Sequence, residues 1–243
     1  MPAPVGRGDV QALSAAGAVL LDVLDPEEFS QAHLPGARNL ALGHLAVDRL
    51  ADLSRGEPLV VYGAGSECDR SARAARLLEH YGFEEVYDYE AGKSDWLAFG
   101  LPFEGDGTVL AVHLLEPCLC VADDETVATL RARLDDQVVP SAVVVDSAGI
   151  VLGLVGRGAL TGAAPDVPAR HVAQLDPVTV RPSAPADELA ALLEDAGTPA
   201  ALVTTSSGRL LGQVTGARLR AGTPAAASAG RRTRPPEALA ATG

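Results

Sequence analysis

The sequence of 243 residues contains few cysteines, few basic residues and few aromatic residues. Its three cysteines are too few for the disulfide framework of a small secreted protein. No apolar run approaches the roughly 18 residues that a membrane-spanning helix requires, and the first residues lack the basic and then apolar pattern of a signal peptide. We therefore expect a cytoplasmic protein that does not bind a membrane.

Basic residues are scarce relative to acidic ones. The 19 lysines and arginines face 32 aspartates and glutamates, which gives a net charge of -13. A surface of this sign repels a phosphate backbone, so we expect no nucleic-acid partner. Hydrophobic residues make up 47% of the chain and charged residues 21%, a composition typical of globular proteins rather than disordered ones.

Aromatic residues are confined to the first half of the chain. No phenylalanine, tyrosine or tryptophan follows Phe103, and a stretch that contains two glycines occupies residues 104–108. This change predicts two domains with different cores, at residues 5–104 and 109–222. The tail at 223–243 is rich in alanine, glycine, proline and arginine, and we expect it to be disordered.

The first domain alternates short apolar runs with amphipathic segments. Such alternation predicts an α/β fold in which helices cover both faces of a parallel sheet. The expected strands are Val19–Val23, Leu59–Tyr62 and Val86–Tyr89, and the expected helices are Asp9–Ala15, Pro26–Phe29, Arg70 or Ser71 to Tyr81, and Lys93–Phe99.

The second domain contains an internal repeat. Residues 139–155 align with residues 198–214, which lie 59 positions later, and the alignment keeps a proline, a glycine turn and the apolar positions. A fixed period of this kind indicates two copies of one unit, at about 109–165 and 168–222. Neither copy is large enough to bury its apolar face alone, so the two should pack together.

Each copy has the same expected α+β order of elements. A short strand precedes an amphipathic helix, and a hairpin and a short helix follow. The expected apolar helix positions are Val127, Leu130 and Leu134, then Leu189, Leu192 and Leu193; the first hairpin strands are expected at 142–145 and 201–204, and the short helices near 157–161 and 216–221.

Short motifs follow one another along the first domain. They are Leu20-Leu-Asp-Val23, Asp25-Pro-Glu-Glu-Phe29, His33-Leu-Pro-Gly-Ala37, Leu59-Val-Val-Tyr62, Ser71-Ala-Arg-Ala-Ala75, Tyr81-Gly-Phe83 and Ala91-Gly-Lys-Ser-Asp-Trp96. In order and spacing they resemble the rhodanese-like family, whose members carry sulfur as a cysteine persulfide. The resemblance implies a parallel sheet with flanking helices and a nucleophilic cysteine directly after Tyr62, beside a helix N-terminus that stabilises a thiolate.

The usual nucleophile is missing from this loop. Gly63 stands where the resemblance places the cysteine, and Leu24 stands where the family often has an arginine. Cys68 is the candidate nucleophile that remains, with Arg70 as a candidate contact for an anion. The helix N-terminus and Arg70 favour a thiolate, whereas the acids that flank Cys68 oppose it. We expect the Cys68 sulfur to lie toward the helix, and therefore little or no rhodanese activity.

Three further residues of the first domain have structural interpretations. The resemblance implies that the turn at His33 sets a loop against the sheet and is not catalytic. Asp22 ends a buried strand, where we expect it to bond backbone groups. We expect Trp96 to pack in the core.

The repeat and the tetrapeptide Gly212-Gln-Val-Thr215 resemble a tandem pair of cystathionine-β-synthase (CBS) domains. The resemblance implies a possible adenine nucleotide near Thr215 and the turn at Ala200. Arg218 replaces the acid that holds the ribose hydroxyls in the family, and the first copy, at Gly153–Ala159, lacks both polar residues. The alternative is a structural or dimerising module without a ligand. We expect a homodimer through the CBS pair.

Cys118 and Cys120 have the spacing of half a zinc site. Two thiols do not complete such a site, and no second pair of cysteines or histidines lies near them in sequence. We therefore expect no bound metal.

Two functions remain open from the sequence. In the first, the chain is a regulatory or sensor protein that joins a rhodanese-like domain without the usual cysteine to a CBS pair. In the second, it is a sulfurtransferase or redox enzyme that uses Cys68. The glycine at position 63 favours the first function, and Cys68 keeps the second open.

Overall fold

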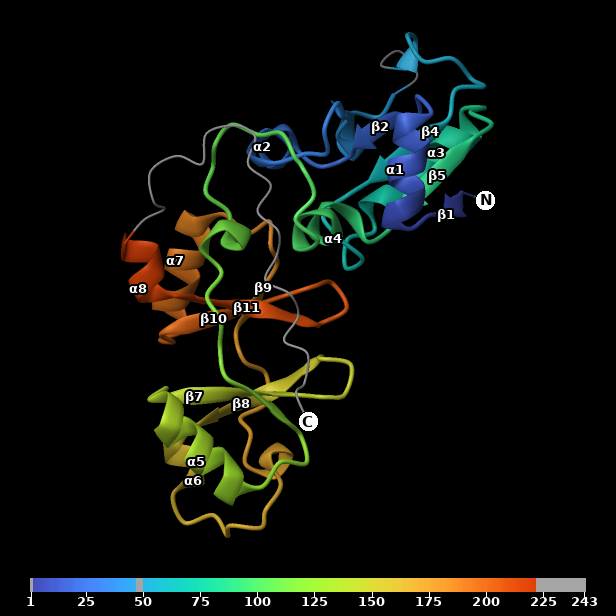
Figure 1. Cartoon of the computed structure of the whole chain (residues 1–243). Coiled ribbons are helices and arrows are strands. Elements are labelled where there is room, and N and C mark those ends of the chain that lie inside the picture. Colours follow the sequence, from blue (N-terminus) through green and yellow to red (C-terminus); the bar gives the residue numbers. More distant parts are fainter. Residues whose placement is uncertain (1, 47–49, 222–243) are drawn as a thin grey trace. The chain divides into compact units, whose positions relative to one another are not determined.

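The computed structural model describes residues 2–46 and 50–221, which form two compact units divided between Val109 and Leu110. Unit 1 runs from blue to green in Figure 1, and unit 2 from green to red. The tail expected to be disordered, at 223–243, lies outside the described residues. Within the described ranges, no helix is both long and apolar enough to cross a membrane.

The strands of unit 1 are β1 (Ala3–Pro4), β2 (Val19–Asp22), β3 (Arg38–Asn39), β4 (Leu59–Tyr62) and β5 (Val86–Tyr89). They form one sheet in the order β1-β5-β4-β2-β3, in which every neighbouring pair is parallel. The predicted parallel sheet is therefore confirmed. β1 and β3 contain two residues each, too few to leave a periodic pattern, and the sequence did not predict them.

The helices of unit 1 are α1 (Arg7–Ala15), α2 (Pro26–Gln31), α3 (Arg70–His80) and α4 (Gly92–Ala98), with a 3₁₀ turn at Leu42–His44. They cover both faces of the sheet because its central strand is apolar on both sides. Along β4, Leu59 and Val61 join one buried cluster with α3. Val60 and Tyr62 point to the opposite face and join a second cluster with Trp96 of α4.

The strands of unit 2 are β6 (Cys120–Ala122), β7 (Ser141–Val145), β8 (Val151–Gly156), β9 (Thr179–Val180), β10 (Ala200–Thr204) and β11 (Leu210–Thr215). The helices are α5 (Val127–Gln137), α6 (Arg157–Leu160), α7 (Ala186–Asp195) and α8 (Gly216–Ala221), with 3₁₀ turns at Ala111–Leu114 and Ala169–His171. The strands form two sheets, β6-β7-β8 and β11-β10-β9, each with one parallel and one antiparallel pair.

The two sheets of unit 2 have the same register. Ser141 pairs with Gly156 in the first copy, and Ala200 pairs with Thr215 in the second. The two hairpins also shift register at equivalent places, just before the last residue of β7 and of β10. The structure therefore contains the repeat that the sequence predicts.

Each copy of the repeat uses a segment of the other to complete its packing. Glu116, from the first copy, pairs with Gln213 of β11, and Gln174, from the second copy, pairs with Leu154 of β8. Ala169 of the second copy is fully buried in the core cluster of the first. This exchange accounts for the packing of two small copies into one unit.

The apolar face of α7 is narrower than the sequence predicts. Leu189 and Leu193 are buried, but Leu192 is 40% exposed. Leu189 and Leu193, four positions apart, define the buried face of α7. Leu192 lies at the edge of this face and is therefore partly exposed to solvent.

The stretch at 104–108, interpreted as a linker, bonds to unit 1. Glu104 and His33 exchange two backbone hydrogen bonds of 2.9 Å, and the N–H of Asp106 donates to the carbonyl of Ser30 at 2.8 Å. These hydrogen bonds hold residues 104–106 beside the C-terminal end of α2.

The start of α4 packs against the loop that follows β4. The N–H of Lys93 donates to the carbonyl of Gly63 at 3.0 Å, and the N–H of Ser94 donates to the carbonyl of Ala64 at 2.9 Å. Gly92 has a φ of +60°, and a Cβ added there would lie 2.5 Å from the carbonyl oxygen of Gly63. Position 92 therefore requires glycine for both its backbone conformation and the close approach.

We expect Gly92→Ala to lower the free energy of unfolding by at least about 2 kcal/mol, because it adds a backbone clash to an unfavourable φ. Gly82→Ala is the matched control. Gly82 also has a positive φ, of +88°, but among the described residues nothing lies within 4 Å of its added Cβ. The control should cost about 1 kcal/mol. Urea denaturation measures both, and equal losses would contradict the close packing of α4 on the loop.

Candidate functional site

The candidate site of unit 1 is the loop at 63–69, between β4 and α3. Gly63 and Gly65 are buried, Cys68 is half-buried, and Glu67 and Asp69 are exposed. The N–H of Cys68 donates to the carbonyl of Gly65 at 2.9 Å, which folds the loop back toward its start.

A side chain at position 63 would fit into this loop. Gly63 does not have a positive φ. A Cβ built there would lie 3.5 Å from Sγ of Cys68, 3.8 Å from a methyl carbon of Leu24 and 3.9 Å from the backbone N of Ser71. These are ordinary contact distances, so the loop has the backbone geometry for a cysteine at 63 beside the N-terminus of α3.

The sulfur of Cys68 lies beside the space that a residue-63 side chain would fill. The turn from Gly65 to Cys68 brings Sγ within van der Waals contact of that space, which also borders the backbone N of Ser71 in the first turn of α3. That the sulfur lies toward the helix therefore stays a prediction. Leu24, which is buried, forms an apolar wall of the same space.

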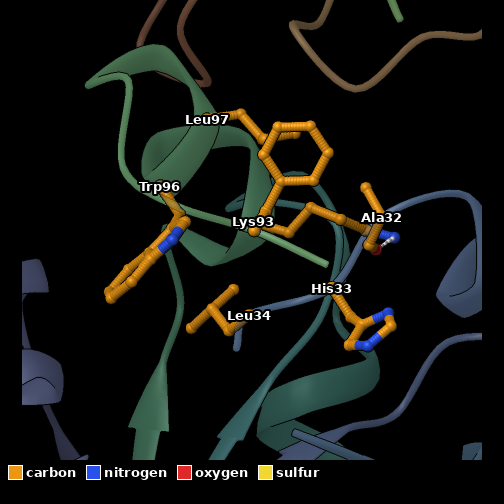
Figure 2. A pocket seen from close by; sticks show the side chains of 7 residues that line it. Ala32, His33, Leu34, Lys93, Trp96 and Leu97 are labelled. Carbon is orange, nitrogen blue, oxygen red and sulfur yellow. Dashed lines mark hydrogen bonds between the residues drawn. The ribbon is translucent and has the colours of Figure 1, made fainter. Parts of the chain in front are cut away.

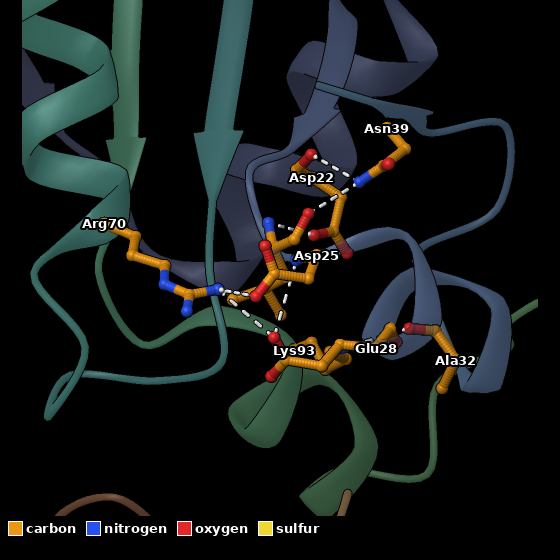
Figure 3. A network of polar contacts seen from close by, with 8 residues as sticks. Asp22, Asp25, Glu28, Ala32, Asn39, Arg70 and Lys93 are labelled. Carbon is orange, nitrogen blue, oxygen red and sulfur yellow. Dashed lines mark hydrogen bonds and ion pairs between the residues drawn. The ribbon is translucent and has the colours of Figure 1, made fainter. Parts of the chain in front are cut away.

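Arg70, the candidate anion contact, lies in the first turn of α3 (Figure 3). Its guanidinium donates to the carboxylate of Asp25 at 3.1 Å and to that of Glu28 at 3.2 Å. Burial lowers the pKa of Arg70, but the two carboxylates outweigh burial and raise it overall. Because these carboxylates already neutralise its charge, Arg70 attracts an anion less than an unpaired arginine would.

A buried lysine, which the sequence analysis did not identify as a site residue, joins α4 to α2 (Figure 3). Lys93 is 5% exposed, and its Nζ donates to the carbonyls of Glu28 and Ala32, at 2.6 and 2.8 Å. Asp22, fully buried, accepts a hydrogen bond from the N–H of Leu24, as expected. Burial lowers the pKa of Lys93 and raises that of Asp22, while their mutual attraction opposes both shifts.

Lys93 also lines a small pocket with His33 and Trp96 (Figure 2). The ring of His33 stacks on Phe29 with centroids 3.8 Å apart, and its Nδ1 lies 2.8 Å from the carbonyl of the same residue. Trp96 is buried and donates from Nε1 to the carbonyl of Pro102. The pocket is too small to admit a water molecule. Trp96 packs in the core, as the sequence predicts, whereas the structural role of the His33 turn stays a prediction.

The candidate nucleotide residues of unit 2 lie together. Ala200 and Thr215 are directly opposite in the hairpin of the second copy. The N–H of Arg218 donates to Oγ1 of Thr215 at 3.1 Å, so Thr215 caps the start of α8. Nε of Arg218 is buried and has no hydrogen-bond partner among the described residues.

A carboxylate that the sequence analysis missed completes this group. The hydroxyl of Thr215 donates to Oε2 of Glu116 at 2.7 Å, across 99 residues of sequence. Glu116 reaches Thr215 because its backbone pairs with Gln213 of β11. No local motif marks Glu116, since the exchange of segments between the two copies places it here.

The first copy has no hydroxyl at the position equivalent to Thr215. Gly156 occupies the position of Thr215, opposite Ser141, and Ala159 occupies that of Arg218. Within the described residues, no cluster of three or more histidine, cysteine or acidic side chains could hold a metal ion, and Cys118 and Cys120 belong to no such cluster.

Comparison with known proteins matches both units. The profile of the rhodanese-like domain matches residues 7–99, and that of the CBS domain matches residues 169–221. The HTH-type transcriptional regulator Rv0324 of Mycobacterium tuberculosis is 35% identical over 101 residues, which cover 41% of this chain and 44% of the regulator. The thiosulfate sulfurtransferase GlpE of Stutzerimonas stutzeri is 35% identical over 85 residues, which cover 35% of this chain and 75% of GlpE.

A solved structure resembles part of the chain as well. The cytosolic domain of the Mg²⁺ channel MgtE, crystallised with ATP, is 24% identical with a TM-score of 0.44, over 46% of this chain and 48% of that one. The motifs around the loop, the parallel sheet and the matched profile agree for unit 1, as do the repeat and the matched profile for unit 2. The chain belongs to the rhodanese-like family through residues 7–99 and carries a CBS domain at residues 169–221.

Proposed function

We propose that this chain is a regulatory protein whose rhodanese-like domain does not turn over thiosulfate. The observation that carries the proposal is the glycine at position 63, where the family has its nucleophilic cysteine. The loop has space for a side chain at this position, beside the N-terminus of α3, but glycine supplies no sulfur to fill it. The match to a transcriptional regulator, over 101 residues of this chain, supports a regulatory role.

The electrostatics of the loop support the same proposal. Thiosulfate is an anion, and the carboxylates of Glu67 and of Asp69, which pairs with Arg73 at 3.9 Å, leave the loop without net positive charge. Arg70, the nearest cation in sequence, is paired with Asp25 and Glu28. The loop therefore lacks a sulfur at its start and an unpaired cation at its end.

A second candidate function is sulfur transfer through Cys68. The contact that favours it is the 3.5 Å distance from Sγ of Cys68 to the Cβ position of residue 63. If Cys68 acts as the nucleophile, its thiolate takes the outer sulfur of thiosulfate and releases sulfite, and cyanide then removes that sulfur as thiocyanate. These steps leave the thiolate unchanged, as a catalytic cycle requires.

A thiosulfate–cyanide assay separates the two functions. We expect little turnover by the wild type, and at least a tenfold gain for the double variant Gly63→Cys with Cys68→Ser, because the Cβ fits and the new sulfur lies beside the helix N-terminus. Removing Cys68 in the same variant prevents a disulfide between positions 63 and 68. The matched control is Gly63→Ala with Cys68→Ser, which adds the Cβ without the sulfur.

Robust turnover by the wild type that disappears in Cys68→Ser would overturn the first proposal and support the second. Equal turnover by the two double variants would show that a sulfur at position 63 does not restore the site.

For the CBS pair we propose an adenine nucleotide as ligand, bound near Thr215, Ala200 and Arg218. The unpaired, buried Nε of Arg218 is a donor that a phosphate oxygen would satisfy. Glu116 opposes such a ligand, because its carboxylate accepts the hydrogen bond of Thr215 and repels phosphate. Nucleotide binding therefore requires the Thr215 hydroxyl to leave Glu116.

We expect Glu116→Gln to tighten ADP binding roughly three- to tenfold, since it removes a negative charge but keeps a hydrogen-bonding side chain. Thr215→Ala should weaken binding, and Glu194→Gln on the exposed face of α7 is the control for net charge. Titration calorimetry measures all three. An absence of heat for AMP, ADP and ATP with both wild type and Glu116→Gln would contradict nucleotide binding.

A homodimer through the CBS pair and a cytoplasmic location are also proposals. The exposed side chain of Leu192 on α7 offers apolar surface to a second copy. All three cysteines are free thiols, which fits a reducing compartment.

A further inference from the structure

Cys118 and Cys120 are two neighbouring thiols that the proposed functions do not use. Leu119, between them, is buried at 5% exposure, and Sγ of Cys120 turns back to lie 3.6 Å from the carbonyl oxygen of Cys118. Both are half-buried and neither is in a disulfide. The pair therefore combines proximity with partial access to solvent.

The contacts around the pair make the two sulfurs chemically different. The thiol of Cys120 donates to the carbonyl of Cys118 at 3.6 Å, and when Cys120 loses its proton it accepts a hydrogen bond from the Cys118 thiol. That hydrogen bond lowers the pKa of Cys120 to about 7 against the effect of burial, and the charge of Arg133 adds to it. The same hydrogen bond raises the pKa of Cys118.

Arg133 of α5 is fixed beside the pair. Its guanidinium donates to the carbonyl of Cys120 at 2.9 Å and to the carboxylate of Glu125 at 2.8 Å. Glu125 neutralises part of the cation, and the rest stabilises a thiolate at Cys120. The contacts around the pair therefore favour the thiolate at Cys120 and the protonated thiol at Cys118.

We propose that Cys118 and Cys120 form a redox-active dithiol that reacts with low-molecular-weight disulfides. The Cys120 thiolate attacks one sulfur of the disulfide, forming a mixed disulfide and expelling a thiolate. Cys118 then loses its proton and attacks Sγ of Cys120, which releases the second small thiolate. Two protein thiols become one intramolecular disulfide while the small disulfide is reduced to two thiols.

The backbone allows the ring to close and makes it easy to reopen. Residues two apart on a strand have Cα atoms about 6.6 Å apart, near the upper end of the range for disulfides. Cys120 begins β6, whereas Cys118 lies before the strand, outside its hydrogen-bonded pairing with β7. A disulfide that closes under such constraint is readily reduced, so we expect the oxidation to be reversible.

The test uses the reduced full chain, incubated with glutathione disulfide, alkylated, cleaved with trypsin and analysed by mass spectrometry. Arg70 and Lys93 separate Cys68 from the pair, so its modification is scored independently. We expect the peptide that contains both Cys118 and Cys120 to lose two hydrogen atoms and to regain them with reduced glutathione. Cys118→Ser should stop at a mixed disulfide on Cys120, formed faster than the one on Cys118 in Cys120→Ser, because the charge of Arg133 still favours a thiolate at position 120.

Three results would overturn the proposal. In the first, both thiols can still be alkylated after equilibration with glutathione disulfide. In the second, both thiols resist alkylation but the peptide loses no mass, as a bound metal would cause. In the third, the two serine variants react at equal rates. Because the pair lies in unit 2, none of these results depends on the activity of the loop at 63–69.

Discussion

The packing of α4 against the start of the 63–69 loop is the contact on which the site of unit 1 depends. Two backbone hydrogen bonds, from Lys93 to Gly63 and from Ser94 to Ala64, fix the direction in which the chain leaves β4. Gly92 allows that approach because it carries no Cβ. The loop therefore keeps its shape without any contribution from a side chain at position 63, and its shape alone does not reveal whether the domain is active.

The chemistry of the loop has diverged from its geometry. A position suited to a sulfur holds glycine, and the nearby guanidinium of Arg70 is engaged by Asp25 and Glu28. A fold serves many functions through the residues at its sites, so the retained shape of the loop is compatible with a role other than sulfur transfer. In unit 2, the carboxylate of Glu116 similarly accepts the hydrogen bond of the Thr215 hydroxyl, the group that would contact a nucleotide.

The sequence predicted the parts of the structure that rest on local patterns. The central strand Leu59–Tyr62 is apolar throughout, and the repeat keeps its turns, so both architectures followed from periodicity. Contacts between distant segments left no local signal. Glu116 contacts Thr215 across 99 residues of sequence. Lys93, the single lysine of the chain, donates from α4 to carbonyls at α2, and the sequence of α4 has no motif that predicts this contact. The turn from Gly65 to Cys68 likewise left no local signal, because it depends on a backbone hydrogen bond.

The central claim is that the loop holds the form of a sulfur carrier without its nucleophile. Single-turnover mass spectrometry tests it most directly. The reduced wild-type chain is mixed with thiosulfate, without cyanide, and the masses of the intact chain and of its peptides are recorded together with those of Gly63→Cys combined with Cys68→Ser. The account predicts that only the variant gains the mass of one sulfur atom, at residue 63. A wild-type chain that gains one sulfur atom on Cys68 would contradict it.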